Sequence, residues 1–172
     1  LEFEEALKLV ERRSQLMQLA GEEQPGGMVA VLGLEDQEVE EICRQGAASG
    51  IAVAASFNAP GQVAVSGDMA ALKRVGELAR EAGAKRVIPL EVSGAFHSPL
   101  MEPAAREMAS LLEAARLCSP QRPVITNVAA RPVEDAEDLR RHLIDQITHA
   151  VRWTESVRCI AGMGVECAAE VG

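Results

Sequence analysis

The chain has 172 residues, and its 17 Lys and Arg against 26 Asp and Glu give a net charge of −9. Apolar residues make up 48% and charged residues 25%, which favours a packed domain over a disordered chain. The acidic balance and the near absence of aromatic residues argue against binding to a phosphate backbone or stacking on bases. No apolar run approaches the ~20 residues of a membrane helix, and no signal-peptide pattern opens the chain. We therefore expect a cytoplasmic protein with neither nucleic acid nor membrane among its partners.

The four cysteines, Cys43, Cys118, Cys159 and Cys167, form no C-x-x-C pair and have no histidine at metal-ligand spacing. This pattern predicts reduced, mostly buried thiols and no metal site. The chain begins at Leu1 within a helical pattern and stops just after an apolar segment. From these ends we expect an internal piece of a longer protein.

The first half of the chain predicts a compact α/β unit. Residues 1–20 carry apolar side chains on one broad helical face, and a polar connector with Pro and Gly follows at 22–27. Next come a strand at 28–32, a helix at 35–48, strands at 51–57 and 62–66, a helix at 68–82 and a strand at 86–92. The order βαββαβ is typical of a ferredoxin-like unit, which we place at residues 26–92.

The second half of the chain has a different pattern of predicted elements. It predicts a helix at 102–117, a short strand at 123–128, helices at 135–149 and 153–161, and a final strand at 165–171. Strands that alternate with helices favour a parallel sheet. The simplest assembly is α/β: the ferredoxin-like unit is inserted into a larger body, to which residues 1–25 and 93–172 belong.

Arg13 does not fit a purely structural helix. On a helical wheel it lies near the middle of the apolar stripe, between Leu9 and Met17. A guanidinium that faces a core needs a carboxylate or phosphate, because burying it unpaired is costly. Two readings stay open: an internal ion pair or snorkelling side chain, or a bidentate clamp for an anionic substrate.

His97 stands where a predicted strand ends in small residues, just before Pro99. Histidine is the side chain that titrates nearest neutrality, so this place suits a general base, although a structural histidine fits it too. His142 and His149 lie on a charged helix and are interpreted as solvated or capping. No G-x-S-x-G elbow is present to hold a serine nucleophile, and no cysteine is placed to replace it. The residues alone therefore indicate half of an acyl-transfer or hydrolase-like site.

A set of segments in fixed order resembles the malonyl-CoA:acyl-carrier-protein transacylases, a family that includes the acyltransferase domains of polyketide and fatty-acid synthases. No single segment is diagnostic, but the ordered set covers essentially the whole chain. The matching segments are 9–18, 28–33, 57–63, 83–86, 89–93, 96–101, 123–124, 127–128, 151–154 and 170–172.

The resemblance implies an α/β-hydrolase-like body with a ferredoxin-like subdomain. It implies that Arg13 grips the free carboxylate of malonate, and that His97 activates a serine and later the carrier thiol. Phe96, in the triplet Ala-Phe-His, would leave no room for a substituent on the malonyl α-carbon. Asn58 and Gln62 would line the substrate cleft.

The resemblance also implies parts that this chain does not contain. The family's G-H-S-x-G serine and its glutamine at the oxyanion hole would precede Leu1, and the carbonyl that orients the histidine is expected beyond Gly172. Ser14 stands where the family more often has glycine. We therefore expect the 172-residue chain alone to be inactive.

The implied reaction moves a malonyl group from CoA to the phosphopantetheine thiol of acyl carrier protein through a seryl ester, in fatty acid biosynthesis. It needs no cofactor beyond the CoA thioester substrate and the phosphopantetheine of the carrier. Two alternatives stay open: the acyltransferase domain of a polyketide synthase, and a non-catalytic ferredoxin-like binding module.

Overall fold

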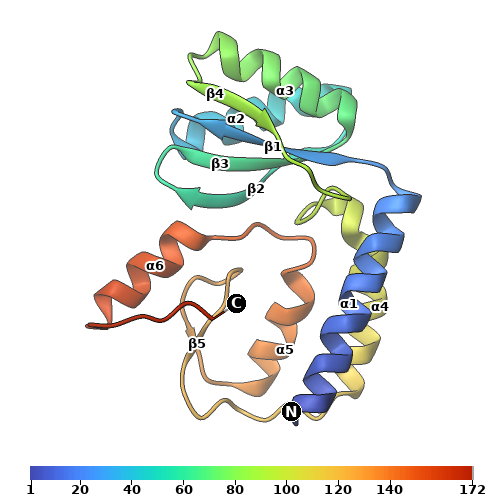
Figure 1. Ribbon diagram of the computed structural model, residues 1–172, viewed down its shortest axis with the longest axis vertical. Helices are drawn as coiled ribbons and strands as arrows, with labels where there is room; N and C mark the ends of the chain where they lie inside the picture. Colours follow the sequence, from blue (N-terminus) through green and yellow to red (C-terminus); the bar gives the residue numbers. More distant parts are fainter. Residues whose placement is uncertain (172) are drawn as a thin grey trace.

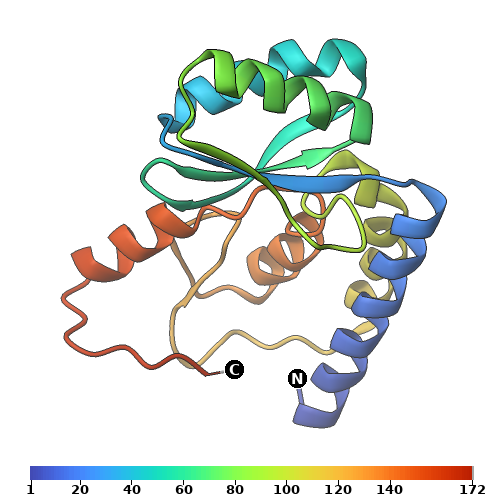
Figure 2. The ribbon, with the colours of Figure 1, turned by 45° about the horizontal axis from the view of Figure 1, so that its top comes forward.

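The computed structural model describes residues 1–171, which fold into two packed parts (Figure 1). The upper part is a four-stranded sheet covered on one face by two helices, and the lower part is a group of helices joined by long loops (Figure 2). Among these residues, no helix has both the length and the apolar character that crossing a bilayer demands.

The upper part has the predicted element order. It consists of β1 (Gly27–Leu32), α2 (Asp36–Gly46), β2 (Ala52–Ala59), β3 (Gln62–Gly67), α3 (Met69–Glu81) and β4 (Arg86–Pro89), with a 3-10 turn at Ala47–Ser49. The strands lie in the order β2-β3-β1-β4, and each neighbouring pair is antiparallel.

The alternation of side chains along the strands gives the sheet two apolar faces. One face packs against α2 and α3 around fully buried residues such as Val31, Val63 and Val75. The other face presents Met28, Ala55 and Ala64 toward the lower part, where Phe96 packs against them. This second face of the sheet therefore borders the space between the two parts.

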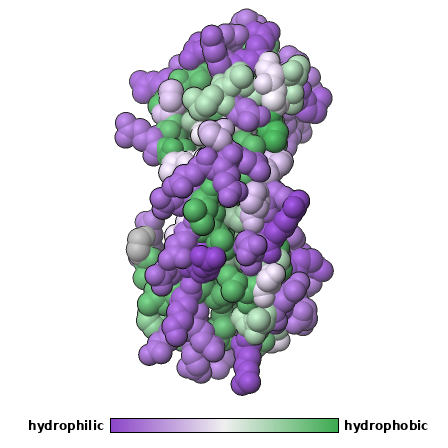
Figure 3. Space-filling model, turned by 90° about the vertical axis from the view of Figure 1, so that its right-hand side faces the viewer, coloured by the Kyte–Doolittle hydropathy of each residue, from purple (hydrophilic) through white to green (hydrophobic). Residues whose placement is uncertain are grey.

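The lower part is built from α1 (Phe3–Glu23), α4 (Glu102–Ala114), α5 (Ala136–Asp145) and α6 (Trp153–Gly162), with a 3-10 turn at Pro99–Met101. The C-terminal half of α1 packs along α4, and their shared core is Leu16, Met17, Ala20, Met101, Ala104, Ala105, Met108, Leu112 and Ile147. The N-terminal half of α1 leaves Phe3, Leu7 and Val10 exposed. Figure 3 looks at the molecule from this side and shows apolar surface in a band over the helical part.

Val151 ties the lower part to the edge of the sheet. Its N–H donates to the Ala55 oxygen (2.9 Å), and its oxygen accepts from the Phe57 N–H (2.9 Å), so that Val151 forms a parallel β-bridge with Ser56. Thr154 adds a bond from its hydroxyl to the Phe57 oxygen (3.0 Å). These bonds satisfy the otherwise open edge of β2 and hold the lower part against it.

The predicted strands of the second half were largely wrong. Residues 123–128 contribute only β5 (Val124–Ile125), which pairs antiparallel with β6 (Pro132–Val133), and residues 165–171 form no strand. The bridge at Val151 is the sole parallel pairing within the described part of the chain, so the expected parallel sheet is not formed there. An apolar run becomes a strand only where a neighbour accepts its main-chain hydrogen bonds, and within residues 1–171 none lies beside 165–171.

Candidate active site

A cavity of about 580 Å³ lies between the sheet and the helical part. Arg13, Asn58, Phe96 and His97 all line it, although they come from α1, β2 and the loop after β4. Gln62 does not: it is exposed at the start of β3 and lies outside the residues that line the cavity. The fold thus brings together four of the five side chains singled out from the sequence.

His97 is held in a conformation that a residue with a Cβ seldom adopts. Its φ of 56° is in the left-handed region. The neighbouring Ser98 is fully buried, and its hydroxyl donates to the Ala95 oxygen (2.6 Å) and accepts from the Leu100 N–H (3.3 Å). The turn that carries His97 is therefore held by the buried Ser98 side chain, and His97 lines the cavity.

The main-chain oxygen of Gln146 lies 2.8 Å from Nδ1 of His97. Because a carbonyl oxygen only accepts, Nδ1 carries the proton and Nε2 keeps its lone pair. The expectation that this carbonyl lies beyond Gly172 was wrong. Gln146 is the C-cap of α5, where the helix leaves main-chain oxygens without partners in the helix.

The surroundings of His97 keep it neutral. Burial lowers its pKa from the ordinary value of 6.5, the Gln146 carbonyl raises it, and the Arg13 charge lowers it, with a net lowering. The negative end of α5 favours positive charge on the ring once a proton is taken up. The imidazole is thus poised to accept a proton on Nε2 at neutral pH.

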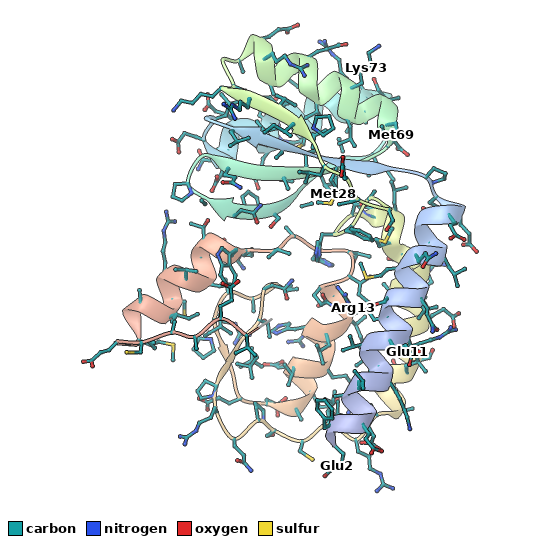
Figure 4. The ribbon with its side chains drawn as sticks, in the orientation of Figure 1. Glu2, Glu11, Arg13, Met28, Met69 and Lys73 are labelled. Carbon is teal, nitrogen blue, oxygen red and sulfur yellow. The ribbon has the colours of Figure 1, made fainter. Side chains whose placement is uncertain are left out.

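Arg13 extends from α1 toward the end of α5 (Figure 4). Its Nη2 donates to the side-chain oxygen of Gln146 (3.1 Å), and the Gln146 amide nitrogen donates to the Leu143 oxygen (3.2 Å). Within residues 1–171, no carboxylate lies within 4.0 Å of the Arg13 guanidinium, so the internal ion pair is not found. Burial lowers the pKa of Arg13, but a guanidinium stays charged near pH 7.

Phe96 and Asn58 shape two other walls of the cavity. Phe96 is half-buried and packs against both the sheet face and the helical core. The Asn58 side-chain oxygen accepts from the Ser56 hydroxyl (2.6 Å), which leaves its amide N–H groups available at an exposed position. The cavity therefore combines one cation, one histidine, one aromatic wall and two amides, those of Asn58 and Gln18.

Comparison with known proteins identifies the family of the chain. The model of the acyl transferase domain family matches residues 1–172. The chain belongs to this family. It is 41% identical over 172 residues to the malonyl CoA-acyl carrier protein transacylase of Haemophilus influenzae, of which it covers 55%.

Solved structures of relatives also resemble this acyl transferase chain. An acyl carrier protein S-malonyltransferase from Vibrio cholerae superposes with a TM-score of 0.91 and 43% identity, covering 96% of this chain and 54% of that one. A malonyl-transacylase in complex with its type II polyketide-synthase acyl-carrier protein gives 0.92 and 40%, covering 96% and 53%. The chain thus spans about half the length of the relatives that it matches.

Of the two other histidines of the chain, one lies where the sequence pattern placed it and one does not. His142 was expected to be solvated or capping, but it is buried, with Nδ1 3.1 Å from the Thr126 hydroxyl, because α5 packs that face against the loop after β5. His149 is exposed, and its Nδ1 lies 2.8 Å from the Asp145 oxygen, as a helix-capping histidine does.

The cysteines are free, as predicted, but the expectation that most are buried was wrong. Cys118 and Cys167 are exposed and Cys159 is partly buried. Cys43 alone lies in the core, where burial raises the pKa of its thiol to about 12 and makes it a poor nucleophile. No thiol lines the cavity among the described residues, and no group of three or more His, Cys, Asp or Glu in that range could hold a metal ion.

Proposed function

We propose that this chain forms the base and the carboxylate clamp of a malonyl-CoA:acyl-carrier-protein transacylase. The observation that carries the proposal is the shared cavity, in which Arg13 and His97 face the same space. Residues 26–92 would be the ferredoxin-like subdomain, and residues 1–25 and 93–172 would belong to an α/β-hydrolase-like body. The family membership and the length of the relatives support this assignment.

In the first half-reaction, a serine hydroxyl attacks the thioester carbonyl of malonyl-CoA. Nε2 of His97 takes the hydroxyl proton, and the imidazolium is stabilised by the Gln146 carbonyl. The tetrahedral intermediate collapses and the C–S bond breaks. His97 gives its proton to the CoA sulfur, and CoA leaves as the thiol. The serine comes from the G-H-S-x-G motif of the family, since the chain itself has no such elbow.

The second half-reaction repeats these steps with a different nucleophile. His97 takes the proton of the phosphopantetheine thiol of acyl carrier protein, and the thiolate attacks the malonyl-serine ester. The serine then leaves with the proton from His97. One base thus serves both halves of a ping-pong cycle, and no cofactor besides the two thiol carriers takes part.

Arg13 supplies the preference for a malonyl group. Its guanidinium presents parallel N–H donors to a carboxylate, and in a partly buried cavity the charge-assisted bonds are strong. An acetyl group would leave the guanidinium without a carboxylate, at a cost of about 2–5 kcal/mol. Phe96 would stand beside the α-carbon, and Asn58 would contact the thioester arm. Gln62 does not line the cavity in this structure and takes no part in the proposed selectivity.

The two alternatives have less support. A non-catalytic binding module does not require a histidine and a guanidinium without a carboxylate partner on the same cavity. A polyketide-synthase domain would use the same chemistry. The match of the whole chain to 55% of the Haemophilus influenzae malonyl CoA-acyl carrier protein transacylase favours the fatty-acid enzyme, which we place in the cytoplasm as part of the proposal.

The decisive test follows the acyl-enzyme in the full-length protein that contains this chain. Mixing it with malonyl-CoA is expected to release one equivalent of CoA in a burst and to leave a malonyl ester that mass spectrometry detects. His97→Ala should abolish the burst, and the 172-residue chain alone should give none. A normal burst from His97→Ala would remove His97 from the mechanism.

A further inference from the structure

Gln146 contacts both functional groups of the cavity. Its main-chain oxygen accepts from His97, and its side-chain oxygen accepts from Arg13. We infer that the Gln146 side chain sets the selectivity of the site for a carboxylate-bearing acyl group, because it holds the Arg13 guanidinium in place with a neutral oxygen. This inference rests on the proposed function.

The orientation of the Gln146 amide is fixed by its two partners. The amide nitrogen donates to the Leu143 oxygen (3.2 Å) in the last turn of α5, so the amide oxygen must face the other way. That side is where Nη2 of Arg13 lies, 3.1 Å away. The end of α5 therefore presents an acceptor to Arg13 without placing a charge there.

Neutrality of this acceptor is the critical property. Several other arginines pair with nearby carboxylates, as Arg74 does with Glu77 and Arg152 with Glu155. Those pairs are exposed, and their charges are compensated. Arg13 is partly buried and its one side-chain partner in the described residues is an amide, so its positive charge remains available to a substrate.

A carboxylate at position 146 would act as an internal competitor. Gln146→Glu is nearly isosteric, keeps the main-chain oxygen on His97, and lets the new side chain form an ion pair with Arg13. A malonyl carboxylate would then have to displace a pre-placed anion, whereas an acetyl group would meet no such competition. The substitution should therefore change the choice between substrates rather than the chemistry.

The experiment measures kcat and KM of the full-length protein with malonyl-CoA and with acetyl-CoA. We expect Gln146→Glu to lower the ratio of malonyl to acetyl kcat/KM by about 10- to 100-fold, mainly through a higher KM for malonyl-CoA. The matched control is Gln15→Glu, the same change beside Arg12 on the solvent side of α1, which should leave the ratio at its wild-type value.

A second variant separates positioning from general damage. Gln146→Leu removes the acceptor but adds no charge, and we expect it to raise the malonyl-CoA KM several-fold, less than Gln146→Glu does. If Gln146→Glu leaves the ratio of malonyl to acetyl kcat/KM unchanged, whether or not both values fall, the inference is overturned while the proposed function stays intact. Wild-type protein that fails to transfer malonyl at all would overturn the proposed function instead.

Discussion

Nδ1 of His97 and the main-chain oxygen of Gln146 lie 2.8 Å apart, although 49 residues separate them in the chain. This contact joins the turn that follows the sheet to the C-terminal end of α5. It determines which nitrogen of His97 can act as the base. Arg13 also binds Gln146, through the side-chain oxygen, so the two side chains that we propose as base and clamp share one neighbour.

The lowered pKa of His97 predicts the pH dependence of acyl-enzyme formation. Because the neutral ring is the active form, the rate should fall on the acid side with a midpoint below 6.5. Arg13→Gln removes a positive charge that lowers this pKa, so the midpoint of the histidine titration should rise. Nuclear magnetic resonance of the His97 ring in both proteins measures the two midpoints, and an unchanged midpoint would contradict the assignment.

The same shift has a consequence for stability. The pKa of His97 is lower in the folded state than in the unfolded state. Between these two pKa values the unfolded chain therefore binds more protons than the folded chain does. The contribution of His97 to the free energy of unfolding is therefore fully present above pH 6.5, and it is lost as the pH falls through the pKa of His97 in the folded state. Urea unfolding at several pH values should show a smaller acid loss in His97→Ala than in the wild type.

Ser98→Ala should loosen the turn that carries His97. The substitution leaves the buried Ala95 oxygen and the Leu100 N–H without their side-chain partner, which costs about 1–3 kcal/mol of unfolding free energy. The turnover number should fall as well, because the left-handed conformation of His97 loses its support. Ser110→Ala, at an exposed position of α4, is the control for the loss of a hydroxyl.

Phe96→Ser tests the aromatic wall of the cavity. Removing the ring opens space beside the acyl group, so methylmalonyl-CoA should become a substrate while malonyl-CoA is still used. Competition between the two thioesters, followed by mass spectrometry of the acyl-enzyme, measures the change. If the variant still excludes methylmalonyl-CoA although it transfers malonyl, then Phe96 does not set this preference.

Local sequence patterns predicted the element order of the upper part of the molecule and singled out two residues that line the cavity. The βαββαβ order follows from alternation within strands and from turn residues between elements, both of which are local. Arg13 was found because a charge on an apolar helical face is anomalous, and His97 because it follows a predicted strand. The structure places both on one cavity, which helical and strand periodicity alone could not establish.

Gln146 illustrates what the sequence could not show. Any residue offers a main-chain oxygen, so no side-chain pattern marks the carbonyl that binds His97. The partner of Arg13 is 133 residues away and neutral, whereas a search for charge complementarity looks for Asp or Glu. The burial of His142 was not predicted for a related reason. Most residues of α5 are charged or polar, so the sequence gives no clear sign of the face that packs inward.

Arg13→Ala in the full-length protein tests the central claim most directly, with transfer of malonyl and of acetyl groups measured side by side. We predict a loss of malonyl kcat/KM by about two orders of magnitude or more, with acetyl transfer retained or increased, because only malonate uses the guanidinium. Arg13→Lys should recover part of the loss, since it restores the charge but not the paired donors. An equal fall for both substrates would contradict the role of Arg13 as the carboxylate clamp.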